Sequence, residues 1–276
     1  MRPSDVLRRA ADHLARYGVE SPRETAEALL MRVLHTDRAG LYSRAEDLDA
    51  REARMFVRAI CQRCAVTPLQ HLTGEQAFRG IALEVRPGVF VPRPETEVLV
   101  GVALEELGDA DGPVVVDVGT GTGAVALSMK DERPDAKVYA TDLSPEAVEL
   151  ARANADRLEL DVVVLEGDLL DPLPPELRGW VDLVVSNPPY VSPTEYEALP
   201  AEVRADPALA LIGGVELYER LAGQVSRWLR DGGSLAAEIG AAHGPEVAEV
   251  FRGSFTDVRI EPDLAGRDRV VVGRRP

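Results

Sequence analysis

From residue 113 onward, the chain alternates short apolar runs with stretches of helical periodicity. The apolar runs that predict buried strands lie at 114–118, 138–142, 162–165, 181–186 and 234–239. A terminal strand pair is expected at 253–260 and 269–272. Strand and helix units that follow one another in this way predict an α/β fold with a doubly wound sheet, and its ligand site should lie at the carboxyl ends of the strands.

The first part of the chain has a different pattern. Residues 1–66 carry apolar positions at helical spacing and predict a small helical domain. Ser21-Pro22-Arg23-Glu24 predicts a helix start with a capping box and a proline at the first helical position, and Asp49-Ala50-Arg51-Glu52 predicts a second one. Residues 67–94, with proline, glycine and a short alternating run, predict a linking hairpin, which leaves 95–276 as the third part.

A glycine turn follows the first strand of the third part. It consists of Gly119, Thr120, Gly121, Thr122 and Gly123, and a helical stretch begins directly after it. Glycines let a backbone approach a ligand closely, and a helix N-terminus offers free N–H groups, so this arrangement predicts a nucleotide cradle. Asp142 ends the next strand, where it can bind two ribose hydroxyls.

A second motif, Asn187-Pro188-Pro189-Tyr190, follows the strand at 181–186. The side-chain oxygen of Asn187 can accept one N–H of a planar NH₂ group. The prolines stiffen the strand end and have no N–H, which leaves the carbonyl of Pro188 free to accept the second hydrogen. Tyr190 offers a flat apolar wall for the group that carries the nitrogen. The motif therefore predicts a site that holds an amide or amino nitrogen in front of a methyl donor.

The two motifs together favour S-adenosylmethionine over a dinucleotide as the ligand. The glycines are spaced G-x-G-x-G, whereas a dinucleotide turn is typically G-x-G-x-x-G. Hydride transfer also gives Asn-Pro-Pro-Tyr no obvious task. The combination resembles the amino-methyltransferases, which modify exocyclic amines of bases or side-chain amides of glutamine.

The resemblance becomes specific at residues 67–74 and 88–97. Thr67-Pro68-Leu69-Gln70-His71-Leu72-Thr73-Gly74 and Gly88-Val89-Phe90-Val91-Pro92-Arg93-Pro94-Glu95-Thr96-Glu97 are similar to segments of the protein-(glutamine-N5) methyltransferases that act on peptide-chain release factors. The likeness covers essentially the whole chain, including Gly167-Asp168 and Ala237-Glu238-Ile239-Gly240. It implies a Rossmann-like class I methyltransferase fold, S-adenosylmethionine as donor, and the glutamine of a Gly-Gly-Gln loop as acceptor.

The resemblance also implies roles for further residues. Asp168 is expected to bind the adenine amino group, with Leu169 packed against the ring. Phe90 is expected to line the methyl-transfer pocket, although it could instead be a core residue of the hairpin. The N-terminal helices would recognise the release factor, although they could instead be a structural cap. The roles of Glu95 and Glu238 stay open between structure and donor binding.

This chain departs from the family pattern in two places. Arg79-Gly80 loosens a small-aromatic pattern, and Ala205-Asp206 lacks an aromatic residue and has a shorter acid than expected. Both departures bear on the grip on the protein substrate rather than on the methyl-transfer chemistry.

Composition narrows the choice of partner. The 276 residues contain 31 Lys and Arg against 47 Asp and Glu, a formal net charge of −16. Such a charge opposes direct binding to a phosphate backbone and favours a basic protein partner. Three alternatives remain: methylation of a ribosomal-protein glutamine, N-methylation of an exocyclic amine in nucleic acid, and a non-catalytic binding module of the same fold.

The remaining sequence features predict neither a metal site nor membrane insertion. Cys61 and Cys64 form the only C-x-x-C pair, inside a predicted helix, and the four histidines are scattered. Zinc needs four gathered ligands, so the two cysteines are interpreted as ordinary helix residues. No apolar run approaches 18 residues. A cytoplasmic location is expected.

Overall fold

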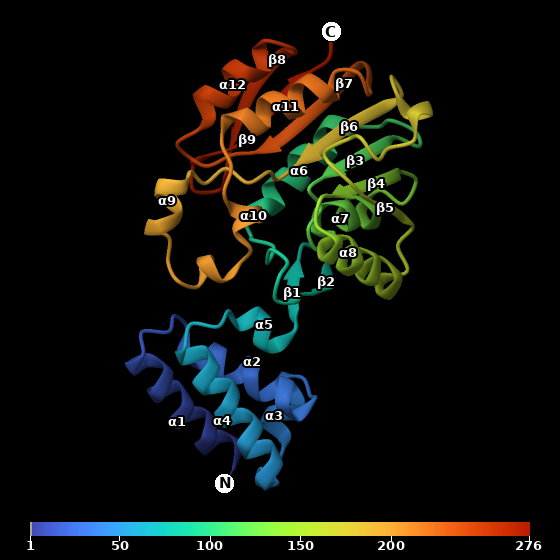
Figure 1. The fold of residues 1–276 in the computed structure, drawn as a ribbon. Coiled ribbons are helices and arrows are strands. Elements are labelled where there is room, and N and C mark those ends of the chain that lie inside the picture. The colour runs from blue at the N-terminus through green and yellow to red at the C-terminus, as the bar shows by residue number, and fades with distance from the viewer. Residues whose placement is uncertain (1) are drawn as a thin grey trace. The chain divides into compact units, whose positions relative to one another are not determined.

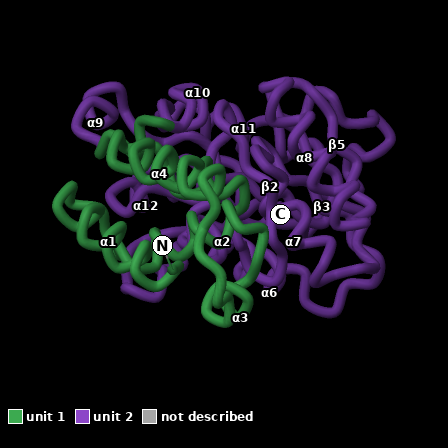
Figure 2. The backbone as a smooth tube through the Cα atoms, turned by 90° about the horizontal axis from the view of Figure 1, so that it is seen from below, with its two compact units in different colours: residues 1–75, 200–205 green, residues 76–199, 206–276 purple. Residues whose placement is uncertain are grey.

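The computed structural model describes residues 2–276 (Figure 1). It divides into two compact units (Figure 2). Unit 1 comprises the chain up to Glu75 together with Pro200–Ala205, and unit 2 comprises Gln76–Leu199 and Asp206–Pro276. The boundary falls within the first strand of a hairpin, and unit 2 contains both predicted motifs.

Unit 1 is helical. Its helices are α1 (Pro3–Arg16), α2 (Pro22–Leu34), α3 (Arg38–Ser43), α4 (Ala50–Cys64) and α5 (Leu69–Thr73). Their apolar faces form one core, whose most buried members are Leu14, Ala26, Leu29, Leu30 and Leu41. The segment Pro200–Ala205 includes the short helix η2 (Val203–Ala205), and Nη2 of the nearly buried Arg63 lies 2.9 Å from Oε2 of Glu202.

Only one of the two predicted capping boxes is present. Asp49 accepts hydrogen bonds from the N–H groups of Arg51 and Glu52, both at 2.7 Å, and Glu52 accepts one from the Asp49 N–H at 2.8 Å. The prediction for Ser21 is wrong, although α2 does begin at Pro22. Ser21 has φ 45° and ψ 56°, whereas an N-cap side chain reaches the first turn from an extended backbone, and it makes no side-chain cap.

Unit 2 begins with the predicted hairpin and continues into a helix. Strands β1 (Glu75–Phe78) and β2 (Ile81–Glu84) pair with each other, and α6 (Thr96–Leu107) follows. Arg79, in the hairpin turn, has φ 47°. Its backbone N–H donates to Oε1 of Glu97 at 3.1 Å and its Nη1 to the Glu97 carbonyl at 3.2 Å, which fixes the hairpin on α6.

A seven-stranded sheet forms the centre of unit 2. In chain order its strands are β3 (Val114–Val118), β4 (Lys137–Asp142), β5 (Val162–Glu166), β6 (Val181–Ser186), β7 (Leu229–Glu238), β8 (Thr256–Pro262) and β9 (Asp268–Arg274). In space the order is β5-β4-β3-β6-β7-β9-β8, with β9 antiparallel to β7 and β8. The predicted doubly wound fold is confirmed, and β7 begins earlier than the apolar run indicated.

Helices cover both faces of the sheet (Figure 1). On one face, α6, α7 (Ala124–Glu132) and α8 (Pro145–Leu158) pack on inward residues such as Val115 and Leu183. On the other face, α11 (Val215–Val225) and α12 (Gly244–Arg252) pack on Val116 and Val184. Because successive residues of β3 and β6 face opposite layers, both strands are predominantly apolar, with Asp117 as the one polar residue of β3.

The chain between β5 and α11 contains short elements that the apolar pattern does not indicate. They are η1 (Pro175–Leu177), α9 (Pro193–Ala198) and α10 (Ala208–Leu211). Helix α9 has a capping box, in which Ser192 Oγ accepts from the Glu195 N–H at 3.2 Å and Glu195 accepts from the Ser192 N–H at 2.9 Å. Single-turn helices lack a full apolar period, so only their caps identify them in a sequence.

Candidate active site

The pairing register brings the ends of four neighbouring strands into one row. The residues paired across β4, β3, β6 and β7 are Thr141, Val118, Ser186 and Ala237. The residues that directly follow them are Asp142, Gly119, Asn187 and Glu238. Strand β3 is also where the chain order reverses, since β4 and β5 lie on one side of it and β6 on the other. The predicted site residues therefore gather at the topological switch point of the sheet, where doubly wound folds bind ligands.

The glycine turn is anchored to β4 and leaves room above it. The N–H groups of Gly119 and Thr120 both donate to the Thr141 carbonyl, at 2.8 and 3.0 Å. Gly119 and Gly121 have φ of 74° and 57°, which other residues rarely adopt, and a Cβ at either position would enter open space. The turn thus has the form of a cradle that a ligand can occupy without displacing protein atoms.

Two acidic side chains, Asp117 and Asp142, fix the glycine turn by hydrogen bonds. Asp117, buried in β3, accepts hydrogen bonds from the Thr120 hydroxyl at 2.6 Å and from the Ala126 N–H at 3.1 Å, and burial raises its pKa to about 7. Asp142 accepts from the N–H groups of Gly121 at 2.8 Å and Ser144 at 2.9 Å. Burial raises the pKa of Asp142, and these backbone hydrogen bonds oppose the rise. Asp142 therefore shapes the turn as well as presenting oxygens at the strand end.

Asp168 lies just beyond β5, in a segment held by α11. Its Oδ2 is 2.5 Å from Nη2 of Arg220, and both side chains are about half exposed. Leu169 packs against the core beneath α11 with φ 49°, an uncommon value for a leucine. The Leu170 N–H donates to the side chain of Gln224 at 3.3 Å. The proposed adenine-binding acid is thus already engaged by a surface arginine.

On the acceptor side, Asn187 and Pro188 present two oxygens without protein partners. Nδ2 of Asn187 donates to Oγ1 of Thr96 at 3.1 Å. Within residues 2–276, neither Oδ1 of Asn187 nor the Pro188 carbonyl accepts a hydrogen bond. Ser186 fixes the strand end below them, since its Oγ donates to the Val118 carbonyl at 2.8 Å.

The segment that leaves the motif is packed closely. Val191 N–H donates to the Leu211 carbonyl at 2.9 Å, and the Gly213 N–H donates to the Val191 carbonyl at 3.0 Å. A Cβ at Gly213 would lie 1.9 Å from the Pro189 carbonyl oxygen, so only glycine permits this approach. Tyr190 is largely buried, which raises its pKa to about 12 and keeps its hydroxyl protonated at neutral pH.

Phe90 lies between two buried residues, Val89 and Val91, but is itself only half-buried. The guanidinium carbon of Arg93 lies 5.3 Å from the centre of the Phe90 ring, within range of a cation–π contact. Asp206, which is buried, forms an ion pair with Arg93 and accepts a hydrogen bond from the Val91 N–H at 3.3 Å. Asp206 therefore orients the loop that carries Phe90.

The two glutamates whose roles the sequence left open have different surroundings. Glu95 is exposed, ahead of α6. Glu238, at the end of β7, is buried, and Nη1 of Arg269 lies 4.0 Å from its Oε1. Burial raises the pKa of Glu238 to about 7, while a hydrogen bond from Thr96 and the charge of Arg269 oppose the rise.

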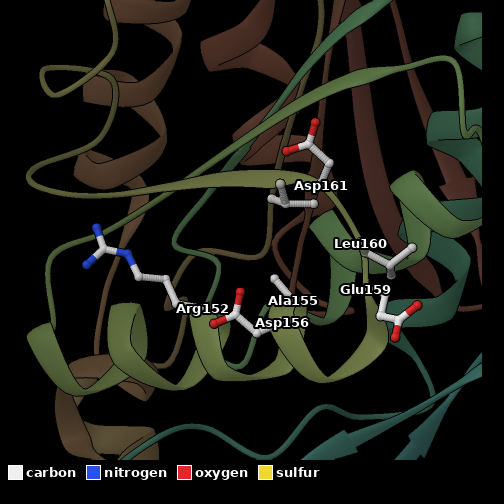
Figure 3. Close-up of a pocket in the computed structure, with 7 residues that line it drawn as sticks. Arg152, Ala155, Asp156, Glu159, Leu160 and Asp161 are labelled. Atoms are coloured by element: carbon white, nitrogen blue, oxygen red, sulfur yellow. The ribbon is translucent and has the colours of Figure 1, made fainter.

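A separate hollow of about 380 Å³ lies between the end of α8 and the start of β5 (Figure 3). Its lining consists of Arg152, Ala155, Asp156, Glu159, Leu160, Asp161 and Val162. Val162 is the first residue of β5, so this hollow lies at the amino end of that strand. The two motifs lie at the carboxyl ends of the parallel strands. The hollow brings together none of the predicted site residues.

Three residues that contribute to the site were not singled out from the sequence. Thr96 is the hydrogen-bond partner of Asn187, although 91 positions separate them in the chain, and Arg93 and Asp206 fix Phe90. In a sequence, a threonine at the first position of a helix is interpreted as part of the helix start. Only the tertiary fold reveals that Thr96 accepts a hydrogen bond from Asn187. Asp206 was noted only as a departure from the family pattern.

Comparisons with known proteins agree with this geometry. Family models match residues 82–204, as the Methyltransferase small domain, and residues 5–74, as the PrmC N-terminal domain. A release factor glutamine methyltransferase of Moorella thermoacetica is 42% identical, over 98% of this chain and 97% of that protein. One of Deinococcus radiodurans is 43% identical, over 100% of this chain and 99% of that protein. The chain belongs to the release factor glutamine methyltransferase family.

Membership of this family confirms the resemblance found in the motifs, and a solved structure supports the fold. The T. Thermophilus 16S rRNA methyltransferase, solved in complex with AdoMet and guanosine, aligns with a TM-score of 0.55 and 20% identity. The alignment covers 73% of this chain and 50% of that chain, and at this identity it shows the fold alone. The prediction of an S-adenosylmethionine-dependent methyltransferase is confirmed at the level of family and fold.

Two further features of the described residues concern the requirements of a metal site and of a membrane-spanning helix. Between residues 2 and 276 no group of three or more His, Cys, Asp or Glu side chains is arranged to hold a metal ion. Cys61 and Cys64 lie in α4 as free thiols. Over the same residues, none of the helices has the length and apolar character needed to cross a bilayer.

Proposed function

We propose that this protein transfers a methyl group from S-adenosylmethionine to the side-chain amide nitrogen of the glutamine in the Gly-Gly-Gln motif of peptide-chain release factors. Asn187, Pro188 and Tyr190 contact the acceptor amide, with Pro189 and Phe90 completing the pocket. The relatives from Moorella thermoacetica and Deinococcus radiodurans are named as release factor glutamine methyltransferases, and their similarity extends over 98% and 100% of this chain.

One observation carries the proposal: two acceptors to which none of residues 2–276 donates are adjacent in the sequence, and the strand before them pairs with the strand before the cradle. They are Oδ1 of Asn187 and the carbonyl of Pro188, and β6 pairs directly with β3. A primary amide has two N–H donors on one nitrogen, so two acceptors fix the plane in which the nitrogen lies. A hydroxyl or thiol has one hydrogen and would satisfy only one of them.

Orientation matters here because an amide nitrogen is a weak nucleophile. Its lone pair is delocalised into the carbonyl, so correct placement supplies much of the catalysis, out of roughly 7–11 kcal/mol available from proximity and orientation. As the new bond forms, the amide hydrogens become more acidic, and their bonds to Asn187 and Pro188 strengthen. That gain is specific to the transition state. The proton released from the nitrogen can go to water, so no general base is assigned.

The donor side is built from the glycine turn and two acids. S-adenosylmethionine supplies an electrophilic methyl group on a sulfonium. Residues Gly119 to Gly123 would hold it in the cradle, with Asp142 on the ribose hydroxyls, and the open space above Gly119 and Gly121 suits such a ligand. Asp168 and Leu169 would contact the adenine, for which Asp168 must share its carboxylate with Arg220.

The partner follows from the charge and the helical unit. A net charge of −16 favours a basic protein surface and opposes duplex DNA or RNA, so no direct nucleic-acid binding is expected. The predicted domain 1–66 would recognise the release factor, the hairpin linker 67–94 would connect it, and 95–276 would carry out the transfer. A release-factor substrate would place the activity in the cytoplasm.

Methylation of purified substrates tests the proposal. The wild-type enzyme is incubated with labelled S-adenosylmethionine and a release factor, and the labelled peptide is mapped by mass spectrometry. We expect one methyl group on the Gly-Gly-Gln glutamine and none on a release factor in which that glutamine is replaced. Label on a ribosomal protein or on nucleic acid, with the release factor unlabelled, would replace the proposed substrate. Salt-sensitive, sub-micromolar binding to duplex DNA would support the nucleic-acid alternative.

A further inference from the structure

A buried polar chain leads from the acceptor site to a carboxylate for which the proposed reaction has no task. Its members are Asn187, Thr96 and Glu238, which come from the end of β6, the start of α6 and the end of β7. Nδ2 of Asn187 donates to Oγ1 of Thr96 at 3.1 Å. Asn187 and Glu238 directly follow the paired residues Ser186 and Ala237, and among the described residues the buried Oε2 of Glu238 has no hydrogen-bond partner. A side-chain interaction with Thr96 opposes the rise in the pKa of Glu238. Thr96 and Glu238 are 4% and 2% exposed, so water competes little for these bonds.

The carboxylate of Glu238 fixes the direction in which hydrogen bonds are donated along this row of three side chains. An ionised carboxylate is only an acceptor, and a threonine hydroxyl has a single hydrogen to donate. When Glu238 is ionised, the Thr96 hydrogen points to it, and Oγ1 of Thr96 is left as an acceptor toward Asn187. Nδ2 of Asn187 must then face Thr96, which turns Oδ1 away from it.

This direction decides what Asn187 offers to an acceptor amide. The two ends of an asparagine amide have nearly the same shape, so packing alone hardly distinguishes them. If the amide were turned over, Nδ2 would face the two N–H donors of the substrate, and donor would oppose donor. The reaction proposed above needs Oδ1 on that side.

We propose that Thr96 and Glu238 are positioning residues, which hold the Asn187 amide with Oδ1 directed at the nitrogen to be methylated. This inference rests on the proposed function and assigns the role of Glu238 that the sequence left open. Neither residue needs to touch the substrate, because both act through Asn187.

The surroundings of Glu238 make the orientation of the Asn187 amide dependent on pH. Arg269 from β9 favours ionisation, Glu95 ahead of α6 opposes it, and burial raises the pKa of Glu238 to about 7. The neighbouring hydroxyls of Tyr190 and Tyr218 stay protonated, since burial raises the pKa of both. A protonated Glu238 carries an O–H that can donate to Thr96, and the chain can then reverse. The fraction of correctly oriented Asn187 should therefore fall as pH falls through 7.

Two substitutions at Thr96 test the positioning role. Thr96→Val keeps the shape and removes the hydroxyl, whereas Thr96→Ser keeps the hydroxyl. We expect Thr96→Val to lower kcat about tenfold or more, the scale of one lost orienting hydrogen bond, with an unchanged Kd for S-adenosylmethionine by calorimetry. Thr96→Ser should restore most of the rate. A Thr96→Val enzyme as fast as wild type, or equal losses in both variants, would overturn the inference.

The pH profile of kcat gives a second readout. Wild type should lose activity on the acid side of pH 7, and Glu238→Gln should be slower but should lack that loss, because it has no titrating carboxyl. An acid-side loss that persists in Glu238→Gln would show that another group causes it. Wild-type enzyme inactive on every release factor would overturn the proposed function together with this inference. An active wild type with an equally active Thr96→Val would overturn the inference alone.

Discussion

The proposed donor and acceptor halves of the site are held in place by different means. The donor half is held through backbone N–H groups at two consecutive strand ends: those of Gly119 and Thr120 donate to the Thr141 carbonyl, and those of Gly121 and Ser144 donate to the Asp142 carboxylate. The acceptor half is held by side chains from distant segments, as in the bond from Asn187 to Thr96. The first half can therefore be damaged by changes within one strand–helix–strand unit, and the second by changes far along the chain.

The sharpest test separates the two halves at Asn187. Asn187→Ala removes one acceptor for the substrate amide, and with it a bond that strengthens in the transition state. We expect methyl transfer to fall by roughly 10² or more, with little change in donor affinity, because the cradle is built elsewhere. Single-turnover rates and calorimetry measure the two quantities on the same preparation.

Asn187→Asp is the matched variant for this test. It keeps an acceptor of similar size, so we expect some residual activity, and its negative charge should tighten binding of the cationic donor. An Asn187→Ala enzyme that methylates a release factor at nearly the wild-type rate would reduce Asn-Pro-Pro-Tyr to a rigid turn.

The converse test changes Asp142, on the donor side. Asp142→Ala removes the carboxylate that accepts from the Gly121 and Ser144 N–H groups, together with the proposed bonds to the ribose. We expect the Kd for S-adenosylmethionine to rise roughly 10- to 100-fold, the scale of one or two charge-assisted hydrogen bonds. Asp142→Asn, which keeps one acceptor oxygen, should lose less. Unchanged affinity in Asp142→Ala would show that the ribose is bound elsewhere.

The stability of the protein should depend on Glu238 in a direction set by its pKa. That pKa is raised from 4.5 to about 7, so between these values the folded protein binds more protons than the unfolded chain. The free energy of unfolding therefore falls as pH rises from about 4.5 to 7, by up to about 3 kcal/mol from this group. Denaturant unfolding at pH 5 and pH 8 should show a smaller fall in Glu238→Gln.

A control for this measurement is Glu166→Gln, which alters an exposed acid at the end of the edge strand β5 of the same sheet. It should leave the difference between pH 5 and pH 8 unchanged. Equal pH dependence in wild type and Glu238→Gln would place the raised pKa on another acid, with Asp117 the next to examine.

The smallest effect is expected at Asp168. This acid is about half exposed and paired with Arg220, so its bond to an adenine amino group would compete with the arginine and with water. Asp168→Ala should raise the Kd for S-adenosylmethionine only a few-fold, within the range of one exposed polar contact. Calorimetry on Asp168→Ala and Asp142→Ala measures the Kd for S-adenosylmethionine under the same conditions. An equally large rise in Kd in both variants would show that the two acids contribute equally to donor binding.

The contrast between the two halves of the site also explains which parts of the structure could be predicted from the sequence. The order of strands and the cradle follow from local patterns, since Val114–Val118 and the glycines after it form a complete strand and turn by themselves. The pairing of Asn187 with Thr96, and of Asp206 with Arg93 and Val91, depends on where distant segments meet. No spacing in the chain records such contacts.

Backbone conformation limited the prediction in a different way. Ser21-Pro22-Arg23-Glu24 has the composition of a capping box, but Ser21 has a left-handed conformation and its side chain makes no cap hydrogen bond. Asp49, with an extended backbone, forms the box that its sequence predicts. The same pattern of residues therefore gave one correct and one wrong prediction, because the pattern does not specify φ.

The division of the chain has a consequence for deletion experiments. Unit 1 is not one continuous piece, because Pro200–Ala205 belongs to it, and Arg63 pairs there with Glu202. A protein that starts at Gln76 would keep this hexapeptide and lose its partners. The next residue is Asp206, which orients Phe90 through Arg93. Removal of the N-terminal helices would thus disturb the loop that carries Phe90, in the proposed acceptor pocket, and single surface substitutions on those helices are the cleaner way to test whether they recognise the substrate.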